Sequence, residues 1–206
     1  MANFPFLSAN LCDGMLGKLL FEPYTIKEVD GVKLGIFGLI SNRYEWDHDL
    51  MVDDPHDIAR DIIAELKEKK CDMIIALTDF VGIDGNKKLA EQVPDINIIV
   101  GGHTNSKPLD TVKINNSIIL YPYFQGRYLG RLDLTIRNGI LDFYDASPAN
   151  AAQSEGRSQY VNTLIPMNDS VDYDPDVQEL VDEYKQLRMD LLRAKAAPPE
   201  AAAAER

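Results

Sequence analysis

The sequence predicts an α/β fold, and three observations carry this prediction. Residues 32–40 (VKLGIFGLI) are apolar at both alternating positions, which is typical of a strand covered on both faces. A helical pattern follows, in which Ile58, Ile62, Ile63 and Leu66 recur at spacings of three and four behind Asp54-Pro55, an N-cap pair. The order then repeats, with a strand in CDMIIALT, a short helix through Lys87 to Val93, and a third strand in INIIVGG.

The pattern changes after His103 to short apolar runs separated by turn residues. Asn115-Asn116 and Asn138-Gly139 are typical of tight hairpin turns, so we expect antiparallel sheet here, including GRLDLTIRNG and ILDFYDA as strands. Residues 149–157 are rich in Ala, Asn, Gln and Ser and predict a surface loop. Asp174-Pro175 then opens a helix with one apolar face, and the last residues, AAPPEAAAAER, are typical of a disordered linker.

Composition excludes several classes of protein. With 45% hydrophobic and 26% charged residues among 206, the chain is an ordinary globular protein rather than a disordered or collagenous one. The 33 acidic residues against 21 basic ones give a net charge of -12, and no run of Lys or Arg offsets it, so we expect no nucleic-acid binding. No segment has the roughly 18 to 20 apolar residues of a membrane span, and we expect no membrane association. Two cysteines do not make a disulfide framework.

The sharpest candidate site is the segment Gly101-Gly102-His103-Thr104-Asn105, directly after the apolar strand INIIV. Two glycines let the chain turn sharply, so the next side chain is presented at the carboxyl edge of the sheet, where α/β folds bind ligands. An imidazole with an amide two residues later suits a metal or an oxyanion. From these residues alone, a loop histidine that bonds only to backbone remains the competing interpretation.

Five segments in order resemble the 5'-nucleotidase branch of the calcineurin-like metallophosphoesterases. They are FPFLSANL, FEPYTIKEVDGVKLGIFGLIS, CDMIIALTDFVGIDGNKKLAEQVPDINIIVGGHTN, GRYLGRLDLTI and LIPMNDSVDYDPDVQELVDEYK. The resemblance implies part of a two-sheet sandwich flanked by helices, followed by a C-terminal connector helix. It divides the chain into a partial metallophosphoesterase domain (4–172), the connector helix (173–195) and a disordered tail (196–206).

The resemblance also implies a dinuclear metal site, of which this sequence shows only the later motifs. The early Asp-x-His, the bridging Asp of Gly-Asp and the Gly-Asn-His motif have no counterpart here. Asp79 stands where the family has an isolated His, and Asn105 replaces the last His, whereas His103 keeps the usual identity. We therefore expect His103, Asn105 and Asp79 to be the metal ligands. An Asp in place of His shifts the preference from Zn towards Mn, Mg or Ca, and we expect weak metal binding by the isolated chain.

Other polar residues are weaker candidates. Arg127 is the one cation near the aromatic group at Tyr121, Tyr123, Phe124 and Tyr128 that could meet a substrate phosphate, against a surface ion pair. We expect the aromatic residues themselves to be core packing, the Trp46-Asp47-His48-Asp49 run to be a solvated loop, and His56 to be a surface residue that interacts with Asp54 and Asp57.

Two functions follow from the sequence. In the first, the chain is part of a phosphoesterase that hydrolyses phosphate monoesters, in particular nucleotides, once the missing N-terminal motifs are supplied by another chain or by upstream sequence. The family's catalytic His has no counterpart here, and no catalytic residue is assigned on this chain. In the second, it is a non-catalytic remnant that acts as a scaffold or binding protein. We also expect the apolar inner face of the sheet to lack part of its cover, because the missing half would supply the facing sheet, and so to bind a partner or a second copy. Members of the family are commonly exported, but no signal peptide is recognisable here.

Overall fold

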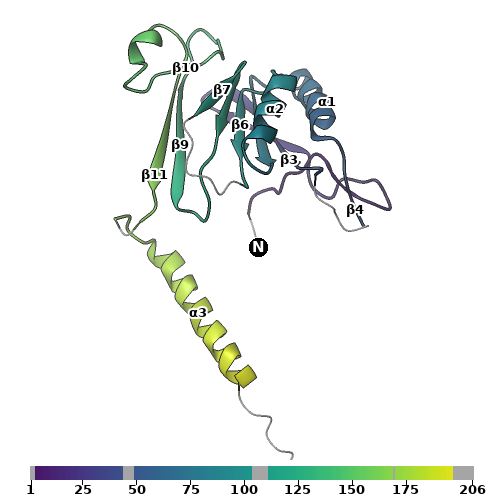
Figure 1. Ribbon diagram of the computed structural model, residues 1–206, viewed down its shortest axis with the longest axis vertical. Coiled ribbons are helices and arrows are strands. Elements are labelled where there is room, and N and C mark those ends of the chain that lie inside the picture. The colour runs from purple at the N-terminus through teal and green to yellow at the C-terminus, as the bar shows by residue number, and fades with distance from the viewer. Residues whose placement is uncertain (1–2, 44–48, 104–110, 169, 197–206) are drawn as a thin grey trace, which may run out of the picture. The chain divides into compact units, whose positions relative to one another are not determined.

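The computed structural model describes residues 3–43, 49–103, 111–168 and 170–196 (Figure 1). The chain divides into two compact units, residues 1–167 and 168–206, which are described separately. Among the described residues, the first unit contains every strand and the second contains one long helix.

A six-stranded mixed sheet forms the centre of the first unit, in the order β2-β3-β5-β6-β8-β7. The four inner strands run parallel, and the two edge strands pair antiparallel with their neighbours. The buried inner strands are the apolar runs of the sequence, because both of their faces are covered. The strands are β2 (Tyr24–Val29), β3 (Val32–Ile40), β5 (Met73–Asp79), β6 (Ile98–Gly101), β8 (Ser117–Leu120) and β7 (Val112–Ile114).

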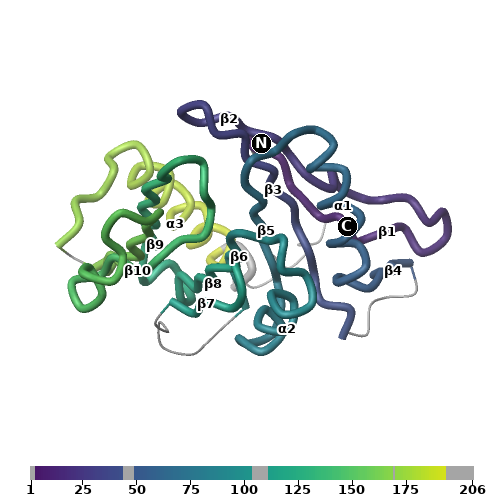
Figure 2. Tube along the Cα trace, turned by 90° about the horizontal axis from the view of Figure 1, so that it is seen from above, coloured from purple at the N-terminus to yellow at the C-terminus, as the bar shows by residue number. Residues whose placement is uncertain are grey.

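Two helices cover one face of this sheet (Figure 2). α1 (Pro55–Glu68) begins as predicted, since the Asp54 carboxylate accepts hydrogen bonds from the backbone N–H groups of His56 and Asp57. α2 (Asp84–Gln92) follows β5. The core on this side joins buried side chains from the sheet and both helices, among them Phe37, Leu39, Leu66, Leu89, Ile99 and Ile119.

A second sheet covers part of the opposite face, and it corrects one expectation. β9 (Tyr128–Thr135), β10 (Tyr144–Asp145) and β11 (Gln159–Pro166) form a three-stranded sheet in the order β10-β11-β9. Buried Met73, Ile98 and Ile118 pack with Phe143 and Tyr160 between the two sheets. The fold is thus the predicted α/β two-sheet sandwich with flanking helices. The facing sheet was expected to come from a missing half, but three of its strands are in this chain.

The antiparallel prediction for the second half of the chain is only partly right. The turns at Asn115-Asn116 and Asn138-Gly139 are confirmed, with Asn115, Asn138 and Gly139 in the left-handed region that such turns need. However, β8 pairs parallel with β6, and β10 has two residues and pairs parallel with β11. β9 pairs antiparallel along its full length with β11. The segment between them, which includes β10 and a 3-10 turn at Ala151–Gln153, brings β11 alongside β9.

A small two-stranded sheet, β1 (Leu11–Asp13) with β4 (Leu50–Val52), completes the first unit. It is tied to the main sheet by Asn10, whose side-chain amide donates to the carbonyl oxygens of Ile40 and Asp53. The segment before it crosses β3 so closely that a Cβ at Gly38 would lie 2.1 Å from the carbonyl oxygen of Leu7.

The second unit is the helix α3 (Pro175–Ala196), capped by Asp174 through the backbone N–H groups of Asp176 and Val177. The apolar face expected for this helix is exposed; its members include Val177, Leu180, Val181, Tyr184, Leu187 and Leu191. No helix within the described part of the chain is long and apolar enough to cross a membrane. The tail after Ala196 lies outside the described residues.

Candidate functional site

The candidate site lies at the carboxyl edge of two neighbouring parallel strands. β5 ends at Asp79 and β6 ends at Gly101, and Thr78 pairs with Gly101 in register. The loop after β6 stays against β5, because the backbone N–H of Gly102 donates to the carbonyl oxygen of Thr78 at 2.7 Å. Side chains that follow the two strands are therefore held at one place on the sheet edge.

The glycines of this segment are required by close packing. A Cβ at Gly101 would lie 2.4 Å from Cε1 of Tyr121 and 2.5 Å from Nδ2 of Asn86, both of which are buried. Gly101 thus lets a strand pass directly over two large side chains. The sharp turn that the sequence predicts for this segment occurs at His103, whose φ of 53° lies in the left-handed region.

His103 and Asp79 meet at this edge. Nδ1 of His103 lies 3.2 Å from Oδ1 of Asp79, and the two side chains are 48% and 55% exposed. The backbone of the two loops is also joined, since the N–H of Gly82 donates to the carbonyl oxygen of His103 at 3.4 Å. The structure therefore brings together two of the three predicted ligands, at a position open to solvent.

A buried polar network, not predicted from the sequence, lies beneath this edge of the sheet. Asn86 of α2 accepts a hydrogen bond from the Thr78 hydroxyl at 2.7 Å and donates one to the Tyr121 hydroxyl at 2.8 Å. Burial raises the pKa of Tyr121 above its ordinary value, so the hydroxyl stays protonated and can donate to the carbonyl oxygen of Ile83. An Asn on the inner face of a short helix was the available signal in the sequence.

Comparisons with known proteins find relatives among the 5'-nucleotidases. No family model matches it. It is 36% identical over 186 residues to a 5'-nucleotidase of Vibrio cholerae, an alignment that covers 72% of this chain and 34% of that protein. It is 27% identical to the protein UshA of Yersinia enterocolitica, over 90% of this chain and 40% of that protein. Among solved structures, a 5'-nucleotidase precursor of Thermus thermophilus has a TM-score of 0.69 at 25% identity, covering 93% of this chain and 39% of that one.

The chain belongs to the 5'-nucleotidase family. A calcineurin-like phosphoesterase of Bacillus subtilis, YfkN, shares the fold with a TM-score of 0.69 at 19% identity. The chain spans about a third of the length of the first two curated nucleotidases that it matches.

Members of this family generally use divalent metal ions, and the side chains at this sheet edge include ligand types that such ions accept. A carboxylate oxygen and an imidazole nitrogen are both metal ligands, and Asp79 and His103 are close enough to serve one ion together. Within the described ranges no group of three or more His, Cys, Asp or Glu side chains comes together. The pair thus fits one side of a divalent-metal site.

The remaining predicted residues have different positions. Asn105 lies outside the described residues. Arg127 donates to the Gln125 side chain at 3.3 Å and stacks over Phe124 at 4.6 Å from the ring centre. The expected core role of the aromatic group holds for Tyr121, which is buried. Of the Trp46 run, only Asp49 is described, and it is exposed.

His56 interacts with Asp54 as expected, but its side chain is more covered than expected for a surface residue. Its Nδ1 lies 3.3 Å from Oδ1 of Asp54, and only 17% of its side chain is exposed. The reason is that the first turn of α1 is folded against neighbouring segments, which a helical pattern alone does not reveal.

Proposed function

We propose that this chain is one component of a metal-dependent phosphoesterase of the 5'-nucleotidase type, which hydrolyses phosphate monoesters and in particular nucleotides. The observation that carries the proposal is the approach of Asp79 to His103 at the carboxyl edge of β5 and β6. A 5'-nucleotidase of Vibrio cholerae as a relative supports the substrate class.

In this function Asp79 and His103 hold a divalent ion from one side, with Asn105 as a further ligand. A bound ion of this kind activates water and stabilises the charge that develops on a transferring phosphoryl group. The carboxylate adds negative charge and a hard oxygen donor, so we expect Mn, Mg or Ca to compete well with Zn. The remaining ligands and the catalytic acid or base come from the early family motifs, supplied by an N-terminal half. Arg127 is the candidate for contact with a substrate phosphate.

Metal binding tests the site directly. Calorimetric titration of the purified chain with Mn²⁺ and Zn²⁺ should show weak binding that Asp79→Asn and His103→Ala abolish. Asp61→Asn, on the exposed side of α1, removes the same charge elsewhere and should leave binding unchanged. Metal binding that survives both site substitutions would contradict the proposed ligands.

Activity tests the need for a second part. The chain alone should show no hydrolysis of nucleotide monophosphates or an aryl phosphate, because a two-metal displacement needs both ions at a fixed separation. Addition of a polypeptide that carries the early motifs should restore it. Metal-dependent turnover by the chain alone, lost in His103→Ala, would refute this expectation.

One observation favours the second candidate, a non-catalytic scaffold or binding protein. The contact between His103 and Asp79 lets an imidazole and a carboxylate satisfy each other, which gives the pair a structural role that needs no metal. In that case the titration shows no metal binding, and His103→Ala changes stability alone.

A further inference from the structure

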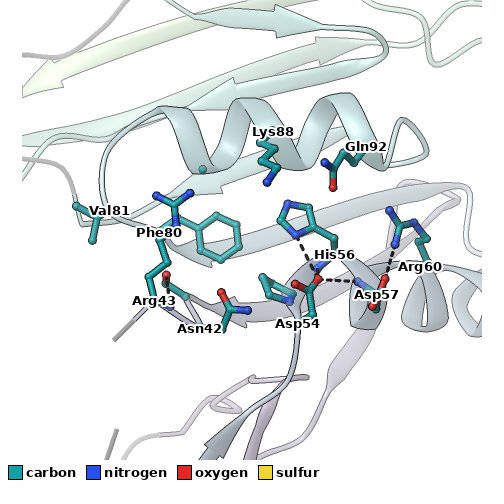
Figure 3. A pocket seen from close by; sticks show the side chains of 13 residues that line it. Asn42, Arg43, Asp54, His56, Asp57, Arg60, Phe80, Val81, Lys88 and Gln92 are labelled. Carbon is teal, nitrogen blue, oxygen red and sulfur yellow. Dashed lines mark hydrogen bonds and ion pairs between the residues drawn. The ribbon is translucent and has the colours of Figure 1, made fainter. Parts of the chain in front are cut away.

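A pocket of about 350 Å³ lies on the helix-covered side of the sheet and is separate from the Asp79–His103 pair. The loop after β3, the first turn of α1, the start of the loop after β5 and one side of α2 enclose it (Figure 3). Phe80, which is buried, forms an apolar wall. Neither Asp79 nor His103 is among the residues that line it.

The charge of this pocket is opposite to that of the chain. Arg43, Arg60 and Lys88 line it, against the two carboxylates of Asp54 and Asp57, whereas the whole chain has a net charge of -12. A local excess of cations in so acidic a protein would attract a small anion and hold it by charge-assisted hydrogen bonds.

Both carboxylates are already engaged. Oδ1 of Asp54 accepts from the backbone N–H groups of His56 and Asp57, at 2.8 and 3.3 Å. Asp57 forms an ion pair with Arg60 at 2.6 Å. Asp54 also occupies the free N–H groups of α1, so the helix end contributes little and the anion must be held by side chains.

The other two cations remain available. No ion pair joins Lys88 or the guanidinium of Arg43 to any residue in the described ranges. Figure 3 shows the Lys88 ammonium directed into the pocket towards His56, with the side-chain amides of Asn42 and Gln92 at the same pocket. Cations and amides from two separate elements, the loop after β3 and α2, thus border one space.

His56 gives an independent indication. Its Nε2 is buried and has no hydrogen-bond partner within the described part of the chain, although its Nδ1 faces Asp54. A buried ring nitrogen without a partner is costly, and such atoms are commonly completed by a ligand or an ordered water. Because Nδ1–H faces Asp54, Nε2 of the neutral ring is an acceptor, so a phosphate held by Lys88 would meet it through a protonated oxygen that donates to it.

We propose that this pocket binds a small phosphate-bearing anion between Lys88, Arg43 and His56. The number of donors suits the several oxygens of a phosphate, and the apolar wall at Phe80 leaves room for a short organic group. The shared chemistry is the phosphate; its source is either free orthophosphate or a small phosphomonoester.

Titration of the full chain, without added metal, tests the proposal. Inorganic phosphate and glycerol phosphate are added in separate arms, binding is measured by calorimetry, and amide shifts are mapped by NMR. We expect at least one of the two to bind, with shifts at residues 41–43, 56–60 and 85–92. Lys88→Gln and Arg43→Gln should each weaken binding about tenfold, as expected for loss of one charged hydrogen bond.

Two controls make the result specific. Lys87→Gln removes the same charge from the neighbouring position, which does not line the pocket, and should leave the affinity unchanged. His103→Ala should also leave it unchanged, which separates this pocket from the proposed metal site. Failure of both ligands to bind at millimolar concentration would overturn the proposal. Binding that is retained in Lys88→Gln and Arg43→Gln, or weakened equally by Lys87→Gln, would do so as well.

Discussion

Substitution of Asn86 by alanine should destabilise the protein strongly, because this side chain joins three elements beneath the candidate site. It is fully buried, and it bonds to Thr78 of β5 and to Tyr121 after β8 from its position on α2. Alanine is a better helix former than asparagine, so any loss of stability reflects the lost contacts rather than helix propensity.

The size of the effect follows from these contacts. Removal of one partner from a buried hydrogen bond costs about 1–3 kcal/mol, and two are lost here. Both hydroxyl groups keep a second, longer contact at 3.4 Å, Thr78 to the Val100 carbonyl and Tyr121 to the Ile83 carbonyl, which places each loss near the lower end. With the small cavity left behind, we expect Asn86→Ala to lower the free energy of unfolding by about 3 kcal/mol.

Urea unfolding followed by circular dichroism measures this change. Glu91→Ala, an exposed position of the same helix, serves as the control and should change stability by less than about 0.5 kcal/mol. Tyr121→Phe should cost about 1 kcal/mol by itself, and the double variant should lose less than the sum, because both substitutions remove one shared bond. A loss below about 1 kcal/mol in Asn86→Ala, or strict additivity with Tyr121→Phe, would refute the network.

Three further predictions concern packing, pH and association. Gly101→Ala should lower the free energy of unfolding by about 1–3 kcal/mol, because its Cβ would overlap the Tyr121 ring. Gly82→Ala is the control, since its Cβ would meet open space and only the backbone strain at its φ of 69° would lower stability. Equal losses of stability in the two variants would contradict this explanation. Burial raises the pKa of Asp54, but the two backbone N–H groups and the nearby imidazole outweigh it and hold this pKa below the ordinary value. Asp54→Ala should therefore lower the free energy of unfolding by about 1 kcal/mol at pH 7. The difference in stability between the variant and the original protein should vanish as the pH falls through the lowered pKa of Asp54. Unfolding curves at pH 7 and below that pKa would check this. An apolar cavity of about 380 Å³ lies between the sheets and is lined by Ile75, Val100, Leu129 and others. We propose that this apolar surface binds a partner half or a second copy of the chain. Light scattering after size exclusion should then not show a sharp monomer peak at about 23 kDa.

Local patterns in the sequence were sufficient for the elements that depend on local physics. The bounds of β3 and the start of α1 were predicted closely, because a strand buried on both faces must be apolar throughout and because Asp54-Pro55 is a strong helix start. The two-residue turns were also recognisable, since few residues tolerate their backbone angles. The resemblance added the sandwich, which periodicity by itself does not specify.

Pairing over long separations could not be predicted in this way. Whether β9 pairs with the next apolar run or with β11 is decided by which segment completes the core around Phe143 and Tyr160. The same holds for the polar contacts: Asn86, Tyr121 and Thr78 lie up to 43 positions apart and form one network only because α2 packs on β5 and β6.

The sequence alone indicated His103 and Asn105 as residues to examine, because their position after an apolar strand and their ligand chemistry are both readable from a linear chain, and the family resemblance added Asp79. The tertiary structure decided that Asp79 and His103 are in contact, that most of the His56 side chain is covered, and that Arg43 and Lys88 share a pocket with it. The physical reason is that strand order and helix packing fix distances between residues far apart in sequence, whereas periodicity reports only which face of its own element each residue occupies.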